Sequence, residues 1–368
     1  MTVAIDVTAI PARLTGAGVY VAELVEALAR RDDVDLALVT RRDDAARWSR
    51  FGTVHAVAPG PRPARLVWEQ LAAPAAARRV GAAVWHGPHY TMPLRIGLPT
   101  VVTIHDLTFF DHPEFHERSK VVVFRRMIRE AAKRADVLVC VSDRTAARLR
   151  ELFDVRARVV AVPLGVDHDR FRPSDDRAGD LAALAPFGVR PPYLVHLGTI
   201  EPRKNVPGLV RAFARAREAR PDLRLVLAGV RGWGTDEVDR AIQAAGCRGA
   251  VDRLGFVDDA VLPPLLRRAE AVVYPSFEEG FGLPVLEGLA CGALVVTSTG
   301  TVMADVADGA ALLVTPGDDV ALARTLLRAV AGDAETARAR ATGPAVAGRY
   351  TWDAAAGAHA EVYRSLGR

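Results

Sequence analysis

The chain has 368 residues, half of them hydrophobic and a quarter charged, which is the composition of a globular protein and excludes an intrinsically disordered one. A formal net charge of +4 suits an anionic ligand or a membrane surface, but it is too small to indicate nucleic-acid binding. No apolar run reaches about 18 residues, so no transmembrane helix is expected, and Met1–Asp6 lacks the basic and apolar regions of a signal peptide.

The three cysteines, Cys140, Cys247 and Cys291, lie far apart and form no CxxC pair. This spacing argues against a disulfide framework and against a zinc site, and it fits the reducing cytoplasm. Nearly every basic residue is an arginine, so a lysine within a motif stands out.

The first half of the chain alternates short apolar segments with helical patterns, which predicts an α/β fold with a parallel, doubly wound sheet. Val3–Val7 is the first expected strand, and the glycine loop Thr15–Gly18 separates it from a helix over Val19–Arg30. A strand, a glycine turn and a helix start together form a common phosphate-binding arrangement. Further strands are expected at 34–39, 82–85, 100–104 and 137–141, and helices at 64–79 and 119–134.

This alternation is interrupted at Pro163–Asp167 and at the polar stretch Arg170–Gly179, so we expect a domain boundary there. The same alternation then restarts. Two α/β halves of similar size, with binding loops at the carboxyl ends of their strands, would face each other across a cleft. In the second half, strands are expected at 193–197, 223–228, 251–254, 271–274, 294–296 and 311–314, with helices at 208–218 and 237–245.

The loop Gly198–Asn205 follows an expected strand and precedes an expected helix. Its adjacent Arg203 and Lys204 combine two cations with the free amides of a helix start. That combination suits a diphosphate, whose charge is spread over several oxygens. A solvated basic loop is the ordinary alternative for an Arg-Lys pair, and this loop alone does not decide between the two.

A second loop, Pro275–Gly282, also connects a strand to a helix, and Pro284 stands where the first helical residue is expected. Its glycines allow the backbone to come close to a ligand. Glu279 in the loop and Glu287 in the helix can accept hydrogen bonds from the vicinal hydroxyls of a ribose or a hexose. A single glutamate here could merely favour the helix dipole, but the whole string is more specific than that.

Together, Gly198–Asn205 and Glu279–Glu287 resemble the signature of the retaining family 4 of GT-B glycosyltransferases, the glycosyl transferases group 1. The resemblance implies the GT-B fold, in which two Rossmann-like, doubly wound parallel-sheet domains face a cleft. It implies an N-terminal acceptor-side domain over residues 1–168, a C-terminal nucleotide-sugar-binding domain over 169–346, and a C-terminal helix over 347–368 that crosses back to the first domain. Supporting segments lie at 103–107, 162–167, 227–233, 254–260 and 350–352.

Residue by residue, the resemblance assigns a catalytic role to four side chains. Arg203 and Lys204 would hold the diphosphate and stabilise the charge that builds up as the sugar leaves. Glu279 would orient the donor sugar and His105 would contact it. One position departs from the family pattern, because Asp305 stands where a glutamate is usual. The other donor-binding positions are Glu287 on the ribose hydroxyls, Gly16 or Gly18 over the phosphates, Phe256 and Val257 against the base, and Gly198, Gly280, Phe281, Gly282 and Leu283 around the phosphates and sugar.

The family retains anomeric configuration, and the resemblance implies the same here. No metal-ligating cluster is visible and no Asp-x-Asp pair lies beside a nucleotide loop, so neither a metal nor a cofactor is expected; the nucleotide-diphosphate sugar is a substrate. The cationic pair would neutralise the leaving diphosphate in place of a metal. With attack on the same face, the leaving phosphate can accept the acceptor's proton, so His105 is expected to position the sugar rather than act as a base.

The segment Gly229–Trp233 resembles bacterial mannosyltransferases, which makes GDP-mannose the first expectation for the donor and leaves UDP- and dTDP-sugars open. A glycan, a lipid-linked sugar or a small molecule would fit as the acceptor. Two other classes stay open: another GT-B enzyme, such as an epimerase or a phosphorylase, and a non-catalytic nucleotide-sugar-binding subunit. A phosphorylase would need a cofactor lysine and a much longer chain, and an epimerase would lack the string Glu279–Glu287.

The segment Glu117–Arg134 is expected to form a helix that touches an anionic membrane surface. Arg125, Arg129 and Lys133 recur every four residues, which places them on one helix face, and Arg126 lies beside them. Such a stripe suits a cytoplasmic enzyme that is peripheral at the inner face of the cell membrane and has a lipid-linked acceptor. A solvated helix face is the alternative.

Overall fold

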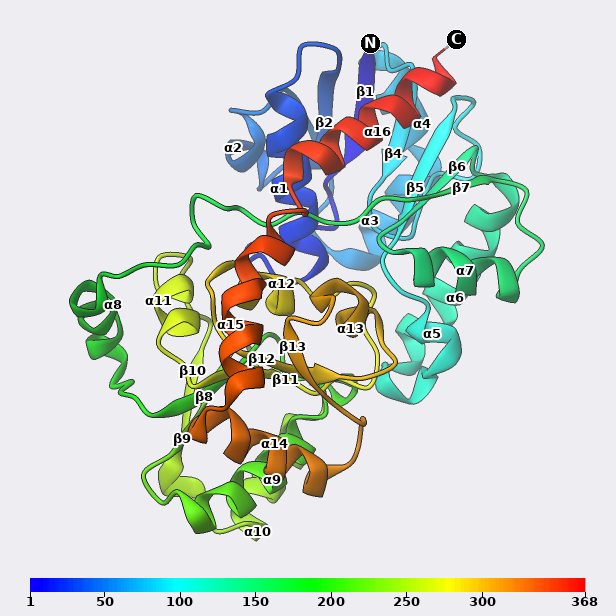
Figure 1. Cartoon of the computed structure of the whole chain (residues 1–368). Helices are drawn as coiled ribbons and strands as arrows, with labels where there is room; N and C mark the ends of the chain where they lie inside the picture. Colours follow the sequence, from blue (N-terminus) through cyan, green and yellow to red (C-terminus); the bar gives the residue numbers. More distant parts are fainter. Residues whose placement is uncertain (368) are drawn as a thin grey trace. The chain divides into compact units, whose positions relative to one another are not determined.

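The computed structural model describes residues 1–367, which form two compact units. Unit 1 comprises Met1–Gly165 together with the segment from Trp352 onward, and unit 2 comprises Val166–Thr351. The chain therefore leaves unit 1 and returns to it with its last helix. Each unit consists of a parallel sheet covered by helices (Figure 1).

In unit 1 the sheet runs in the order β3-β2-β1-β4-β5-β6-β7, and every neighbouring pair is parallel. The strands are β1 (Thr2–Asp6), β2 (Asp35–Arg41), β3 (Thr53–Ala58), β4 (Val84–Gly87), β5 (Thr100–Ile104), β6 (Val137–Cys140) and β7 (Arg158–Ala161). The helices are α1 (Ala17–Ala29), α2 (Ala45–Trp48), α3 (Arg62–Leu71), α4 (Ala73–Arg79), α5 (Thr108–Asp111), α6 (Arg118–Arg134), α7 (Asp143–Leu152) and α16 (Trp352–Leu366). The strand order reverses between β1 and β4, and open parallel sheets bind ligands at such a switch point.

The last helix, α16, packs on α1 within unit 1, as Figure 1 shows. A buried hydrogen-bond chain joins the two helices to the sheet. His359 of α16 bonds through Nδ1 to the carbonyl of Ala355 at 2.8 Å, so this nitrogen carries the proton. In the neutral ring Nε2 is then an acceptor, and the Tyr20 hydroxyl must donate to it over 3.0 Å. Because the Tyr20 proton is committed, the Thr103 hydroxyl donates to the Tyr20 oxygen, also over 3.0 Å.

The same chain continues to a second histidine. The Thr103 oxygen lies 2.9 Å from Nε2 of His86, which must donate because the hydroxyl proton of Thr103 is used. Nδ1 of His86 therefore accepts from the Tyr363 hydroxyl of α16 over 2.8 Å. One backbone carbonyl thus fixes the direction of every bond, and α16 is attached to the sheet at two points.

In unit 2 the sheet runs in the order β10-β9-β8-β11-β12-β13, again with every neighbouring pair parallel. The strands are β8 (Tyr193–Leu197), β9 (Arg224–Ala228), β10 (Val251–Gly255), β11 (Ala271–Tyr274), β12 (Val295–Ser298) and β13 (Ala311–Val314). The helices are α8 (Arg177–Leu184), α9 (Val206–Ala219), α10 (Thr235–Ala244), α11 (Leu262–Arg267), α12 (Leu283–Ala290), α13 (Val302–Ala307), α14 (Asp319–Ala331) and α15 (Ala334–Ala347). Here the strand order reverses between β8 and β11.

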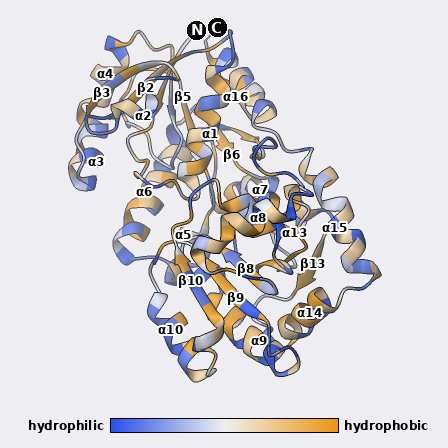
Figure 2. Ribbon diagram, turned by 90° about the vertical axis from the view of Figure 1, so that its left-hand side faces the viewer, coloured by the Kyte–Doolittle hydropathy of each residue, from blue (hydrophilic) through white to orange (hydrophobic). Residues whose placement is uncertain are grey.

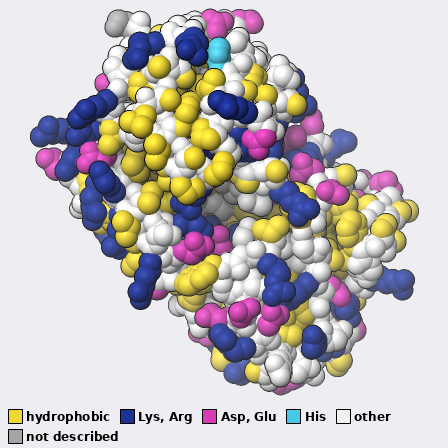
Figure 3. All heavy atoms as spheres, turned by 180° about the vertical axis from the view of Figure 1, so that it is seen from behind, with side chains coloured by type: hydrophobic (Ala, Val, Ile, Leu, Met, Phe, Trp, Pro, Cys, Tyr) yellow, Lys and Arg dark blue, Asp and Glu magenta, His cyan; other side chains and the backbone are white. Residues whose placement is uncertain are grey.

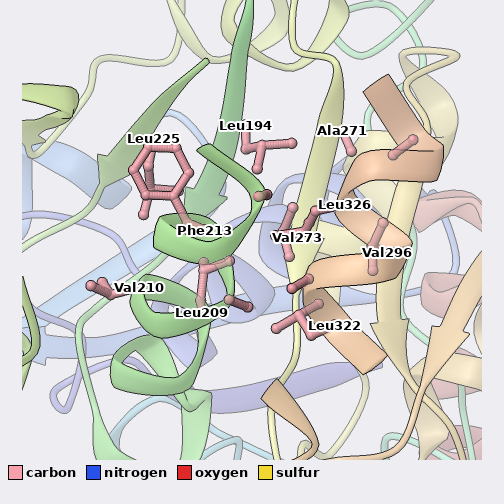
Figure 4. Close-up of a cluster of buried hydrophobic side chains, with 14 of the residues drawn as sticks. Leu194, Leu209, Val210, Phe213, Leu225, Ala271, Val273, Val296, Leu322 and Leu326 are labelled. Atoms are coloured by element: carbon pink, nitrogen blue, oxygen red, sulfur yellow. The ribbon is translucent and has the colours of Figure 1, made fainter. Parts of the chain in front are cut away.

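The core of unit 2 lies between this sheet and helices α9 and α14. Their apolar side chains recur at helical spacing and pack on the strand residues, and the ribbon of α9 carries both hydrophobic and hydrophilic residues (Figure 2). The strands are apolar on both faces, as expected where helices cover both sides of a parallel sheet. Figure 4 shows this cluster, which includes Leu209, Phe213, Leu322 and Leu326 of the helices and Leu194, Leu225, Val273 and Val296 of the strands.

The predicted fold class is confirmed: both halves are doubly wound parallel sheets of α/β type. The sequence missed β3 and β7, which are the two edge strands of unit 1 and are only partly buried, so their apolar pattern is weak. The single helix expected at 64–79 is two helices that meet at Ala72. Ser142 caps α7, because its hydroxyl accepts a hydrogen bond from the backbone N–H of Thr145 over 3.2 Å. Among residues 1–367, no helix is both long and apolar enough to cross a membrane.

Candidate functional site

The two motif loops of unit 2 meet at its switch point. The loop after β8 carries Gly198, Arg203 and Lys204, and the loop after β11 carries Glu279. A backbone hydrogen bond of 2.7 Å from the N–H of Phe277 to the carbonyl of Arg203 joins the two loops. Residues 75 positions apart in sequence therefore form one site, because β8 and β11 are neighbouring parallel strands.

Lys204 is a buried ammonium in this site, with only 7% of its surface exposed. Its Nζ lies 5.2 Å from the centroid of the Tyr274 ring, and it packs so closely on Gly198 that a Cβ at that glycine would lie 2.4 Å from it. Burial lowers the pKa of Lys204. Within residues 1–367, no hydrogen bond or ion pair of Nζ is seen, although the carboxylates of Glu279 and Glu201 attract the ammonium and partly offset the effect of burial on its pKa. A buried cation of this kind calls for an anionic ligand.

Arg203 and Glu279 form an ion pair in which Nη1 of the arginine donates to Oε2 of the glutamate. Arg203 also donates from Nε to Glu201 at 2.9 Å. The other oxygen of Glu279 accepts hydrogen bonds from the hydroxyls of Tyr274 at 3.2 Å and Ser276 at 3.4 Å. The Glu279 carboxylate is therefore held from two sides, beside the Lys204 ammonium.

Two residues of this site were missed from the sequence, Tyr274 and His196. Tyr274 is the last residue of β11, and His196 lies in β8 with its ring stacked on that of Tyr274 at 5.2 Å and 13°. Nδ1 of His196 donates to the Val273 carbonyl over 3.0 Å, and burial lowers the pKa of His196 to about 3. The signal that could have pointed to His196 is an imidazole within an otherwise apolar strand.

Helix α12 begins at Leu283 rather than at Pro284, which is its second residue. Gly282 has a φ of 98°, and a Cβ there would lie 2.7 Å from Cγ of Met303, so this position requires glycine. Glu287 is buried in the second turn of the helix.

The neighbouring Gly280 and Phe281 are buried in the loop before α12. The ring of Phe281 packs edge-on against Tyr350 at 5.8 Å, so this side chain supports the loop rather than facing a ligand. A donor contact at Phe281 would have to use its backbone.

Phe256 and Val257 follow β10, at the same edge of the sheet. Strand β9 stands between β10 and β8, so these two residues do not join the cluster around Lys204. Val257 is buried and Phe256 is half-buried.

The segment Gly229–Trp233 packs on the loop after β8. A Cβ at Gly229 would lie 2.0 Å from the Gly198 carbonyl oxygen, and one at Gly232 would lie 2.3 Å from that of Ile200. Both glycines are thus required by loop packing, and the resemblance of this segment to mannosyltransferases carries no separate information about the donor.

In unit 1, His105 directly follows β5. Its Nε2 donates to the Pro88 carbonyl over 2.8 Å, which leaves the lone pair of the neutral ring on Nδ1. Burial lowers the pKa of His105 and favours the neutral form. The ring lies edge-on to Tyr20 at 5.0 Å and to Tyr90 at 5.3 Å.

Of the two N-terminal glycines, Gly16 lies in the expected loop and Gly18 does not. Helix α1 begins at Ala17, so Gly18 lies inside its first turn and only Gly16 remains in the loop. Gly16 has a φ of 48° with open space where a Cβ would stand, whereas a Cβ at Gly18 would make ordinary contacts. Tyr20, one turn further along α1, connects this helix start to His105. Asp305 lies in the first turn of α13 in unit 2.

Both halves of the chain match known families. Residues 185–345 match the family described as glycosyl transferases group 1, and residues 14–170 match glycosyltransferase family 4. The chain is 34% identical over 273 residues to the O-antigen chain mannosyltransferase B of Escherichia coli, covering 73% of this chain and 71% of that protein. It is 31% identical over 373 residues to a D-inositol 3-phosphate glycosyltransferase of Actinosynnema mirum, covering 87% of each.

A similar architecture is found in the solved structure of the Anabaena protein HepE in complex with UDP-glucose. The two structures have a TM-score of 0.79 over the full length of both chains at 20% identity, which shows a common fold. With two parallel-sheet units, two matched families and relatives above 30% identity, the chain belongs to family 4 of the GT-B glycosyltransferases.

Proposed function

We propose that this chain is a retaining, metal-independent glycosyltransferase that moves a hexosyl group, with mannose from GDP-mannose as the first candidate, to a glycan or lipid-linked acceptor. The observation that carries the proposal is the buried Lys204 ammonium, which lacks an acceptor within residues 1–367 and lies beside Arg203 and Glu279 at a switch point. A nucleoside diphosphate would supply the anionic acceptor oxygens with which Nζ makes no hydrogen bond in the empty site.

The proposed mechanism uses Arg203 and Lys204 to stabilise the charge that builds up on the diphosphate as the sugar leaves. The acceptor hydroxyl attacks the same face of the sugar, and its proton passes to the leaving phosphate oxygen. His105 can accept a hydrogen bond from a sugar hydroxyl at Nδ1, because Nε2–H is committed to the Pro88 carbonyl. Glu279 orients the sugar and Glu287 binds the ribose.

The choice of mannose is supported by the relative from Escherichia coli, whose name is that of a mannosyltransferase. UDP-glucose is the second candidate, because the Anabaena neighbour of the same fold was solved with it. An inositol phosphate is the small-molecule alternative for the acceptor, given the relative from Actinosynnema mirum.

Alanine variants of the two cations and of the two carboxylates should differ in their effects on donor turnover and on diphosphate binding. Arg203→Ala and Lys204→Ala should each lower the turnover of the donor about a hundredfold, since loss of one charged transition-state contact costs roughly 3 kcal/mol. Glu287→Ala should weaken the nucleoside diphosphate and the donor alike, whereas Glu279→Ala should spare the diphosphate and impair transfer. Calorimetry with the diphosphate, together with turnover, separates these cases.

Glu237→Ala, at an exposed position of α10, is the matched control and should behave as the wild type. Normal turnover in both cation variants would show that Arg203 and Lys204 do not stabilise the leaving diphosphate. Equal effects of Glu279→Ala and Glu287→Ala on diphosphate binding would show that their roles are assigned wrongly.

We also propose that unit 1 touches an anionic membrane surface through α3 and α6. On helix α3 the polar Glu69 is buried, while the apolar Val67 and Leu71 are exposed by 58% and 78%. Val122 of α6 is exposed by 70%, and Arg62 of α3 lies over the Phe124 ring of α6 at 5.6 Å, so the two helices are neighbours. Figure 3 shows apolar side chains gathered with Lys and Arg side chains around them.

The cationic stripe predicted on α6 needs one correction. Arg125 donates from Nε to the carbonyl of Phe109 at 2.7 Å, so it fastens α5 to α6 instead of standing free on the stripe. Arg126, Arg129 and Lys133 are exposed and stay available to anionic lipid.

Sedimentation with vesicles of phosphatidylcholine, with and without phosphatidylglycerol, tests the membrane proposal. The wild type should bind the anionic vesicles at low salt, since each basic residue near the surface contributes on the order of 1 kcal/mol. Leu71→Asp with Val122→Asp should abolish binding, while Leu313→Asp, at a half-exposed position of β13, should not. Absent binding, or binding unchanged by the double substitution, would contradict the proposal.

A further inference from the structure

Tyr274 makes three directed contacts at the end of β11, and its side chain is almost fully buried. Its hydroxyl donates to Oε1 of Glu279 over 3.2 Å. Its ring has Nζ of Lys204 at 5.2 Å on one side and is stacked on the ring of His196 at 5.2 Å. One side chain therefore contacts both the carboxylate and the ammonium of the site.

The ring is an attractive partner of the Lys204 ammonium, in addition to the nearby carboxylates of Glu279 and Glu201. The face of an aromatic ring carries partial negative charge, and this attraction strengthens when the cation is desolvated, as it is here. Gly198 completes the arrangement, because a Cβ there would lie 2.4 Å from Nζ and 3.6 Å from the Tyr274 hydroxyl oxygen. The space allowed to the ammonium is thus set by the ring on one side and by bare backbone on the other.

The hydroxyl has a separate role. Oε2 of Glu279 is held by Arg203, so the Tyr274 hydroxyl, assisted by Ser276 at 3.4 Å, fixes the orientation of the remaining oxygen. Without it the carboxylate could turn about its bond to Arg203. The ring of His196 stacks on one face of the Tyr274 ring, and the hydrogen bond from Nδ1–H of His196 to the Val273 carbonyl keeps the two rings stacked.

We propose that Tyr274 is a positioning residue for both parts of the donor: its ring sets the Lys204 ammonium for the diphosphate, and its hydroxyl sets Glu279 for the sugar. The inference rests on the proposed function and divides one side chain into two separable roles. Removing the hydroxyl alone and removing the whole ring should therefore have different effects.

Tyr274→Phe keeps the ring and loses the hydroxyl. It should bind the nucleoside diphosphate within about twofold of the wild type and lower kcat for donor turnover about five- to tenfold, the usual effect of one lost hydrogen bond. Tyr274→Leu loses both features and should also weaken diphosphate binding about tenfold. The probe is the member of a GDP, UDP and dTDP panel that stabilises the wild type, together with its hexose-bearing donor.

A double-mutant cycle tests the hydroxyl independently of Tyr274→Leu, in case that variant fails to fold. If the hydroxyl acts through Glu279, then Tyr274→Phe should cause no further loss of kcat in the Glu279→Ala background. Tyr193→Phe is the matched control: this tyrosine is equally buried in β8, and its hydroxyl donates to the Leu265 carbonyl at 2.8 Å. It should lower stability without changing kcat or diphosphate binding.

Three results would overturn the inference: equal losses of diphosphate binding and kcat in Tyr274→Phe, additive losses in the cycle, or wild-type diphosphate binding in Tyr274→Leu. Failure of the proposed function gives a different result, because Lys204→Ala would then itself leave diphosphate binding unchanged. Binding that depends on Lys204 but not on the Tyr274 ring would overturn the positioning role alone.

Discussion

Lys204 is charged at a site where burial lowers its pKa, so its ammonium raises the free energy of the empty folded protein. In the unfolded chain the pKa is higher, and the unfolded state therefore binds more protons between the two values. The free energy of unfolding should therefore rise as the pH rises from the folded-state pKa to the unfolded-state pKa. Below the folded-state pKa the buried charge destabilises the protein in full. A bound diphosphate would remove this cost by supplying the counter-charge.

Lys204→Met should accordingly stabilise the empty protein while destroying its function. Methionine fills a similar volume without a charge, so we expect about 1 kcal/mol of stabilisation, which is roughly 2–4 °C in Tm for a unit of this size. The stabilisation of the wild type by a nucleoside diphosphate should vanish in the variant. Differential scanning calorimetry with and without ligand measures both effects, and Lys120→Met, at a surface lysine of α6, is the control. A less stable variant that still responds to the ligand would refute this account of Lys204.

The sequence singled out the charged residues of the candidate site but not the side chains that pack against them. The charged side chains lie in two glycine-containing loops between a strand and a helix, a pattern that indicates ligand binding: Arg203, Lys204 and Glu279. Tyr274 and His196 lie within apolar strands, and strand periodicity alone counts them as core. Their role depends on the pairing of β8 with β11, which brings together residues distant in sequence.

At the scale of elements, α16 is the piece whose function was least visible in the sequence. It was expected as a helix that returns to the first half, but nothing in its sequence indicated that His359 and Tyr363 would bond to Tyr20 and His86. The bonds link α16 to α1, whose residue Tyr20 also packs against His105. A helix at the end of the chain thereby orders the surroundings of a predicted site residue.

His359→Leu should weaken unit 1 and change its response to pH. The pKa of His359 is lowered by burial to about 4 from 6.5, so the unfolded chain takes up this proton first as the pH falls, and the wild type loses stability between those values. At pH 8 the variant should be less stable by about 1–3 kcal/mol, because the Tyr20 hydroxyl loses its acceptor. As the pH falls from 6.5 to 4, the free energy of unfolding of His359→Leu should decrease less steeply than that of the wild type, by up to about 1.4 kcal/mol per pH unit.

Urea unfolding at pH 8 and pH 5 measures both differences. His112→Leu, at a partly exposed histidine, should leave stability at pH 8 nearly unchanged. Equal pH dependence in wild type and His359→Leu would show that the buried chain of hydrogen bonds does not exclude the proton from His359.

At the scale of the whole molecule, the sequence predicted the architecture well because both units repeat one simple pattern. Apolar strands buried on both faces alternate with amphipathic helices, and each sheet reverses its strand order once, between β1 and β4 and between β8 and β11. The errors fall where burial is partial, at edge strands β3 and β7, and where one helical pattern contains a break, at Ala72. Donor identity was not predictable in this way, since Gly229 and Gly232 serve loop packing.

The central claim is that the loops after β8 and β11 bind the diphosphate of a sugar donor through Lys204. Calorimetric titration of GDP, GDP-mannose, UDP and UDP-glucose into the wild type and Lys204→Met tests it most directly. The account predicts saturable binding of one nucleoside diphosphate and its sugar to the wild type, with GDP and GDP-mannose first, and loss of both in the variant. Undiminished binding to Lys204→Met, or no binding of any of the four ligands to the wild type, would contradict it.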